Sequence, residues 1–129
     1  MPDIQFESTD VPKAVGPYSQ AIKAGDLIFV SGQIGIMPST GRVVEEGVVA
    51  QSRQIFRNIK AILRDEGCTM EQIVKCEVYL KNISDFQPVN AVFAEVFTKG
   101  TKPARHTVQV VGLPMGAMIE IACVAYAGK

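Results

Sequence analysis

The chain has 129 residues, of which 47% are hydrophobic and 20% are charged, and we expect them to form a single domain over residues 1–129. Thirteen Lys and Arg residues balance thirteen Asp and Glu residues. Zero net charge gives no overall attraction to nucleic acid or anionic lipid, so neither is expected as a partner. The longest apolar run, Ile121 to Ala127, is seven residues, whereas a membrane-spanning helix needs about twenty.

The cysteines and the N-terminus indicate a cytoplasmic protein. The first residues contain neither the basic nor the apolar segment of a secretory signal. Three widely spaced cysteines suit reduced thiols better than a disulfide framework. Cys76 and Cys123 fall in strand-like runs, where cysteine acts as a small buried hydrophobe, whereas Cys68 lies between elements and could be exposed. One histidine and no CxxC pair exclude the usual zinc ligand sets, so no metal is expected.

The first third of the chain is predicted to be β structure. Residues 14–20 contain Gly16 and Pro17 and indicate a loop. Apolar runs at 21–24 and 27–31 flank a Gly-Asp pair, which is typical of a hairpin, and residues 37–41 indicate a turn.

Two helices are predicted in the middle of the chain. Between Val49 and Glu66, apolar residues recur at helical spacing, and Gly67 suits the position just past the helix end. A second helix is expected to begin after Asp85 and to end by Gly100. Between the helices, residues 73–80 alternate as a half-buried strand does.

Residues 106–111 and 118–125 are predicted as the last two strands. The resulting order, roughly β-β-β-α-β-α-β-β, indicates an α+β fold with one sheet of about five to six strands and two helices on one face. The other face would then expose apolar side chains, which soluble monomers rarely do, so we expect a homo-oligomer.

Two charged residues are candidates for chemistry. Arg105 opens a predicted strand, where a guanidinium could hold a carboxylate through two hydrogen bonds, although most arginines are simply solvated. Glu120 interrupts the apolar run 118–125 and is either a solvent-facing charge or a carboxylate in a cleft between subunits. If the last two strands pair with Val111 opposite Met118, Arg105 and Glu120 share one sheet face with Thr107 and Gln109.

Two small, polar segments rich in glycine, residues 16–20 and 31–35, could let a ligand approach the backbone, although segments of this kind are more often ordinary turns. His106 should point away from Arg105 by strand alternation, which favours a non-catalytic role. The chain contains no phosphate-binding glycine loop and no nucleophile elbow.

Six short motifs in order resemble the Rid family of reactive intermediate deaminases, also called YjgF-type proteins. They cover nearly the whole chain: Gly-Pro-Tyr-Ser-Gln-Ala (16–21), Val-Ser-Gly-Gln-Ile (30–34), Val-Asn-Ala (89–91), Pro-Ala-Arg (103–105), Gly-Leu-Pro (112–114) and Ile-Glu-Ile (119–121). The resemblance implies a chorismate-mutase-like fold and a homotrimer with clefts between subunits. It also implies hydrolysis of 2-imino acids, such as 2-iminobutanoate and 2-iminopropanoate, to 2-keto acids and ammonia, without a metal or an organic cofactor.

The resemblance also assigns roles to residues. Arg105 would bind the substrate carboxylate, and Glu120 matches the acidic residue of the last strand. On physical grounds, a carboxylate there could stabilise a protonated imine and orient or deprotonate the attacking water. Other substrate-binding positions would be Tyr18, Ser31, Gly32, Asn90 and Thr107. The chain departs from the family pattern at Thr107, where some members have Cys, and at Ala122, where a second Glu is common.

Two alternatives to an imine-hydrolysing enzyme remain open. The same cleft could bind a small carboxylate without turnover and regulate a partner. Some family members are described as translation inhibitors or ribonucleases, but zero net charge and the lack of clustered basic and aromatic residues weigh against RNA as the substrate.

Overall fold

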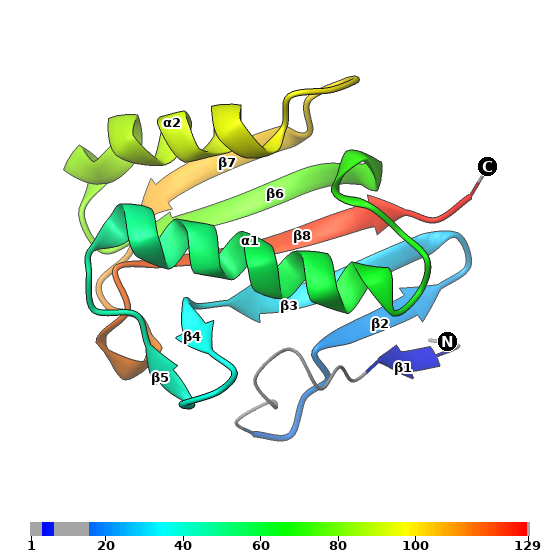
Figure 1. Ribbon diagram of the computed structural model, residues 1–129, viewed down its shortest axis with the longest axis horizontal. Helices are drawn as coiled ribbons and strands as arrows, with labels where there is room; N and C mark the ends of the chain where they lie inside the picture. The colour runs from blue at the N-terminus through cyan, green and yellow to red at the C-terminus, as the bar shows by residue number, and fades with distance from the viewer. Residues whose placement is uncertain (1–3, 7–15, 129) are drawn as a thin grey trace.

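The fold is a six-stranded mixed sheet with two α-helices packed on one face, given by a computed structural model that describes residues 4–6 and 16–128 (Figure 1). The sheet runs in the order β1-β2-β3-β8-β6-β7, and β4 and β5 form a separate two-stranded sheet. The elements are β1 (Ile4–Phe6), β2 (Ala21–Ala24), β3 (Leu27–Gln33), β4 (Ile36–Met37), β5 (Arg42–Val43), α1 (Val48–Arg64), β6 (Ile73–Leu80), α2 (Phe86–Val96), β7 (Ala104–Gln109) and β8 (Ile119–Tyr126).

Both predicted helices are confirmed, with shifted ends. The apolar stripe of α1, which includes Ile55, Ile59 and Ile62, is buried against the sheet. α1 ends at Arg64 rather than Glu66, and Gly67 follows with a φ of 75°, a left-handed conformation that few other residues adopt. α2 follows Asp85 as expected, although the Asp85 side chain makes no capping hydrogen bond.

The predicted hairpin of β2 and β3 is confirmed, but the predicted pairing of the last two strands is wrong. β8 lies between β3 and β6, and β7 pairs in parallel with the far side of β6 at the sheet edge (Figure 1). The polarity of the two strands accounts for this order. Alternate residues of β8 are apolar and buried, which suits a central strand, whereas β7 carries Arg105, His106 and Gln109, which suit an edge.

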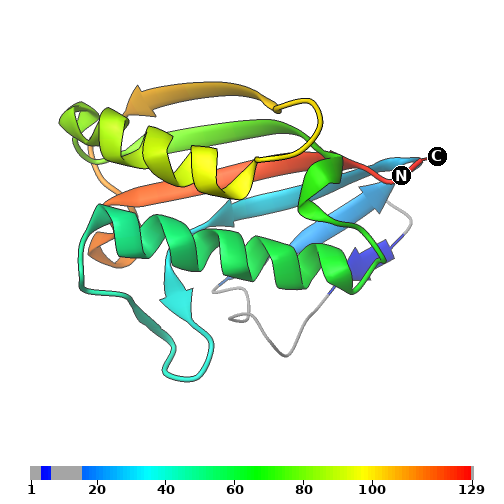
Figure 2. The same cartoon turned by 45° about the horizontal axis from the view of Figure 1, so that its top comes forward.

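Helices cover one of the two faces of the sheet. α1 and α2 lie side by side over one face, which we call the helix face (Figures 1 and 2). Its strands contribute buried side chains such as Val78, Ile119 and Ile121 to the main core. No element among residues 4–6 and 16–128 covers the other face, called here the open face. Phe29 and Tyr126 on that face are 45% and 43% exposed, as the expectation of an uncovered apolar face requires.

A polar contact joins α1 to the small sheet. Buried Asn58 donates a hydrogen bond of 2.9 Å from Nδ2 to the carbonyl oxygen of Ile36 and accepts one of 2.9 Å from Gln54. The predicted turn at residues 37–41 is the connection between β4 and β5. Within the described ranges, none of the helices has the length and hydropathy needed to cross a lipid bilayer.

Candidate active site

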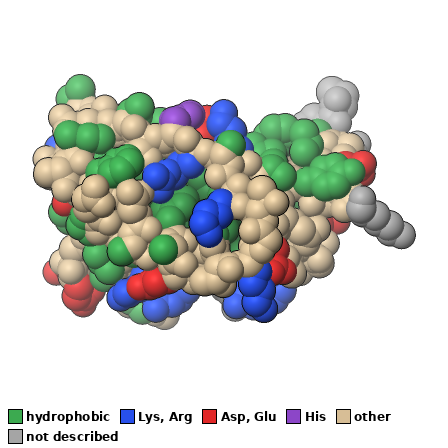
Figure 3. Space-filling view, turned by 90° about the horizontal axis from the view of Figure 1, so that it is seen from above, with side chains coloured by type: hydrophobic (Ala, Val, Ile, Leu, Met, Phe, Trp, Pro, Cys, Tyr) green, Lys and Arg blue, Asp and Glu red, His purple; other side chains and the backbone are tan. Residues whose placement is uncertain are grey.

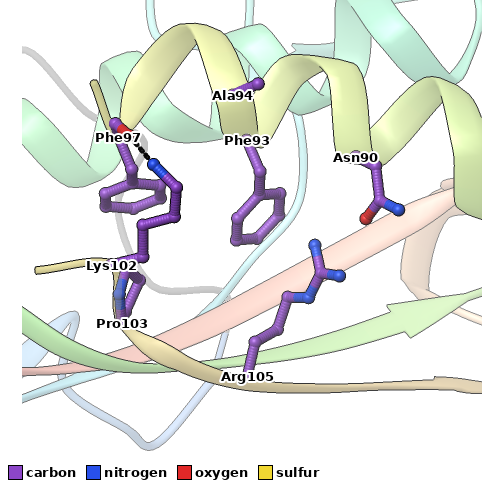
Figure 4. A pocket seen from close by; sticks show the side chains of 7 residues that line it. All are labelled: Asn90, Phe93, Ala94, Phe97, Lys102, Pro103 and Arg105. Carbon is purple, nitrogen blue, oxygen red and sulfur yellow. Dashed lines mark hydrogen bonds between the residues drawn. The ribbon is translucent and has the colours of Figure 1, made fainter.

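A pocket of about 380 Å³ lies between α2 and the segment that leads into β7. Figure 3 looks onto this side of the molecule, where hydrophobic side chains line a hollow flanked by Lys and Arg. Figure 4 shows the lining residues, which are Asn90, Phe93, Ala94, Phe97, Lys102, Pro103 and Arg105. Three of them, Asn90, Phe93 and Ala94, lie on α2, and Phe97 follows directly at its C-terminal end, so one face of the helix forms a wall of the pocket. We call this cavity the arginine pocket.

Arg105 reaches from β7 into the arginine pocket toward α2 (Figure 4). Its guanidinium carbon lies 4.7 Å from the ring centre of Phe93 and 5.4 Å from that of Phe86. Among the described residues no hydrogen bond or ion pair engages this guanidinium, and its N–H donors are therefore available to an anionic ligand. The side chain of Asn90 points toward the same group (Figure 4).

Thr107 shares the helix face with Arg105, as strand alternation predicted, because the two residues pair with buried Val78 and Cys76. The Thr107 hydroxyl is buried and has no hydrogen-bond partner among the described residues. A buried polar group without a partner costs free energy, but Thr107 is not among the residues that line the arginine pocket. Gln109, the next residue on this face, is already engaged, since its side-chain oxygen accepts a 2.8 Å hydrogen bond from the Ile83 amide.

Glu120 lies on the open face, directly over Gly32. A β-carbon placed on Gly32 would stand 2.3 Å from Oε2 of Glu120, so only glycine leaves room for this carboxylate. Partial burial raises the pKa of Glu120 above its ordinary value, because desolvation disfavours the charged form. The Glu120 carboxylate is therefore a stronger base than a fully solvated one.

Ser31 precedes Gly32 on β3, and hydrogen bonds connect it to the loop that contains Tyr18. The Ser31 hydroxyl donates a hydrogen bond to the Ser19 carbonyl oxygen, and its amide donates one of 2.9 Å to Gln20. These bonds tie the end of β3 to the loop that carries Tyr18, whose side chain is 48% exposed.

The strand pairing that would place Arg105 and Glu120 on one sheet face does not occur. β6 separates β7 from β8, and Glu120 pairs with Tyr79, whereas Arg105 pairs with Cys76. Successive side chains on a strand point to opposite faces, so Arg105 lies on the helix face and Glu120 on the open face. The two strands are also about 10 Å apart, twice the usual strand spacing. One chain therefore contributes two half-sites that cannot close on one small molecule.

His106 points away from Arg105, as alternation predicted, and lies on the open face. Its Nε2 is 4.0 Å from Oε2 of Glu77, and its ring meets that of Tyr79 edge-on with centroids 6.3 Å apart. These contacts connect His106 to the strand next to it rather than to the arginine pocket.

The cysteines are structural. All three are free and buried. Cys68, which could have been exposed between two elements, is therefore buried as well. Burial raises the pKa of Cys76 to about 12 and also raises that of Cys123, which makes both thiols poor nucleophiles. Over the described parts of the chain, no group of three or more His, Cys, Asp and Glu side chains is arranged to hold a metal ion.

Comparisons with known proteins identify the family. The family model described as Endoribonuclease L-PSP matches residues 8–127. The chain belongs to this YjgF/Rid family. The 2-iminobutanoate/2-iminopropanoate deaminase of Homo sapiens is 44% identical, over 95% of this chain and 89% of the human protein. Reactive Intermediate Deaminase A, chloroplastic, of Arabidopsis thaliana is 45% identical, over 88% of this chain and 60% of its own length.

The fold agrees with that of solved family members. The crystal structure of RidA from the Antarctic bacterium Psychrobacter sp. PAMC 21119 superposes with a TM-score of 0.92 at 40% identity, covering 96% of this chain and 99% of that one. The predicted α+β class, with two helices on one face of the sheet, is confirmed by both the structure and this likeness.

Sequence reasoning missed the aromatic surroundings of Arg105. Phe86 and Phe93 fit the apolar stripe of α2, and a stripe of this kind indicates core packing. The spacing of Asn90 and Phe93 on α2, continued by Phe97 at its end, was a usable signal, because it places a polar side chain on the same stripe as the aromatic ones.

Proposed function

We propose that this Rid-family chain hydrolyses reactive 2-imino acids to 2-keto acids and ammonia, in clefts formed between the subunits of a homotrimer. The observation that carries the proposal is the Arg105 guanidinium, which projects into a pocket with no carboxylate of the described residues bound to it. The deaminase names of the human and Arabidopsis relatives support imino acids over RNA as the substrate. Reduced thiols favour the cytoplasm as its location.

Arg105 binds and orients the substrate in this proposal. A guanidinium and a carboxylate form two parallel hydrogen bonds, which a lysine cannot match. Asn90 lines the same pocket and provides a further polar contact, and we expect Thr107, the next residue on the same face of β7, to contribute beside it. Fixing the carboxylate holds the neighbouring imine carbon in one pose.

Glu120 acts on water and on the imine nitrogen. The protonated imine is the electrophile, and a nearby carboxylate stabilises its positive charge. Glu120 accepts a proton from water as the water oxygen bonds to the imine carbon, and the proton passes to nitrogen. Glu120, again a carboxylate, then takes the hydroxyl proton as the carbon–nitrogen bond breaks, so that ammonia leaves and the carbonyl of the 2-keto acid forms. A general base of this kind contributes about 10²–10⁴-fold.

The placement of the two half-sites supports an assembly of several subunits, and membership of the Rid family favours a homotrimer. Because Arg105 and Glu120 lie on opposite faces of one sheet, we expect the Glu120 that serves a given Arg105 to come from a neighbouring subunit. The apolar open face, with Phe29 and Tyr126 half exposed, is the surface we expect neighbouring subunits to cover. Tyr18, Ser31 and Gly32 would accompany Glu120 into the cleft. The reaction needs no metal or organic cofactor, since water and the two side chains supply the chemistry.

The test is the rate of 2-iminobutanoate loss, followed by stopped flow after a pyridoxal-phosphate dehydratase has released the imine. The wild type should accelerate this loss, and Arg105→Ala should lower kcat/KM by about 10- to 150-fold, the value of a charged hydrogen bond. Arg105→Lys should recover only part of the loss. Lys99→Ala, which removes an exposed cation outside the pocket, is the matched control.

Three results would count against the proposal. Equal rates for wild type and Arg105→Ala would exclude Arg105 as the substrate anchor. Tight binding of 2-ketobutyrate without faster imine loss would instead favour a regulatory protein that binds small carboxylates. RNA binding that weakens steeply with salt in a nuclease-free preparation would favour the RNA alternative.

A further inference from the structure

The guanidinium of Arg105 is held by aromatic rings rather than by an acidic partner. Its carbon lies 4.7 Å from the ring centre of Phe93 and 5.4 Å from that of Phe86, both within the range of cation–π attraction. No carboxylate or carbonyl oxygen among the described residues takes part. The position of this cation therefore depends on two side chains of α2, Phe86 and Phe93. Figure 4 shows the second of these rings beside the guanidinium.

An aromatic partner leaves the cation competent to bind an anion. A carboxylate in the same place would neutralise Arg105 and occupy the N–H donors that a substrate needs. A ring attracts the positive charge through its π face and accepts no conventional hydrogen bond. The arrangement fixes the long arginine side chain while its donors stay available.

The Phe93 ring is itself held in place. It is buried and meets the Phe56 ring of α1 edge-on, with centroids 5.2 Å apart and planes at 86°. It also lies against Phe97, with centroids 5.6 Å apart. Phe86, half-buried at the first turn of α2, approaches the guanidinium as well.

We propose that Phe93 and Phe86 are positioning residues that hold Arg105 ready for the substrate carboxylate. The inference rests on the proposed function, because it assigns these rings to the same site. A guanidinium that is already ordered binds a carboxylate without first losing side-chain freedom. Loss of a ring should therefore weaken substrate binding and leave the chemical step, which depends on Glu120, almost unchanged.

The test compares Phe93→Leu with wild type in KM and kcat for 2-iminobutanoate and in the Kd of 2-ketobutyrate by calorimetry. We expect KM and Kd to rise by about 3- to 30-fold, the range of one cation–π contact, with kcat within about twofold. Phe93→Tyr keeps the ring face and should restore both constants. Val92→Ala is the control for lost packing, because Val92 is buried on the same helix but does not line the pocket.

Equal rises in KM for Phe93→Leu and Val92→Ala, or no rescue by Phe93→Tyr, would overturn the inference. If Phe93→Leu does not fold, Phe86→Leu at the less buried ring provides the same comparison. The two proposals fail in different ways. A wild type that binds 2-ketobutyrate without hydrolysing the imine overturns the deaminase activity alone, while the Kd values still decide the role of the rings.

Discussion

Alanine at Gly32 should impair catalysis while leaving the fold intact. A β-carbon at this position would lie 2.3 Å from Oε2 of Glu120, 2.8 Å from its Cδ and 3.1 Å from its Cγ. Ordinary van der Waals contact begins at 3.4 Å, so the carboxylate oxygen must retreat by 3.4 − 2.3, about 1.1 Å. Gly32 has no left-handed φ, and its backbone accepts alanine without strain.

The size of the effect follows from that displacement. Moving a catalytic group by about 1 Å can cost about 10²-fold in rate, and we expect a loss of this order in kcat. The atoms that collide are the end of a flexible, half-buried side chain, so they can move without disturbing the core. The free energy of unfolding should therefore change by less than about 0.5 kcal/mol, as for an ordinary surface substitution.

Stopped-flow imine hydrolysis and urea unfolding of Gly32→Ala test this pair of expectations. Gly112→Ala is the matched control, because nothing lies within 4 Å of a β-carbon there. In a Glu120→Ala background, Gly32→Ala should have no further effect on rate, since the side chain through which it acts is gone. Full activity of Gly32→Ala, or an equal loss in both backgrounds, would refute the reasoning.

Three further substitutions test other parts of the account. Burial raises the pKa of Glu120, so the folded chain keeps a proton that the unfolded chain releases, and stability should fall as pH rises from 4.5 through the raised value. Glu120→Gln should remove this fall in thermal unfolding, and an unchanged pH profile would count against it. Phe29→Glu places a charge on the open face and should lower the mass measured by analytical ultracentrifugation. Val111→Glu, at a 99% exposed position off the sheet, should not; equal masses for both would contradict the proposed interface. Asn58→Leu leaves the Ile36 carbonyl without its hydrogen bond and should cost about 1–3 kcal/mol in urea unfolding; no measurable cost would show that this contact is dispensable.

The helices and strands could be predicted from local pattern, because burial imposes a period on each. Ile55, Ile59 and Ile62 fall on one side of a helix, and Val78 and Leu80 alternate with polar residues as a strand does. The same alternation placed Arg105 and Thr107 on one side of β7 and His106 on the other.

Strand neighbours could not be predicted in this way. Alternation determines which residues share a face of their own strand, but it does not determine which strand lies alongside. β7 and β8 are consecutive in the chain, so a hairpin is the simplest expectation, yet the apolar β8 gains more burial between β3 and β6. Because β8 pairs with β6 instead of β7, Glu120 does not lie beside Arg105. The Phe93 and Phe86 contacts to Arg105 also depend on packing between distant segments.

The most direct test of a shared intersubunit site is complementation between two inactive variants. Arg105→Ala keeps Glu120, and Glu120→Gln keeps Arg105, so a mixed trimer contains some clefts in which both native groups meet. After the two variants are unfolded together and refolded at equal concentration, about a quarter of the clefts should be intact, because the interfaces of a cyclic trimer are heterologous. Imine hydrolysis should then recover to about a quarter of the wild-type rate. A mixture that assembles and stays as inactive as its parents would contradict the account.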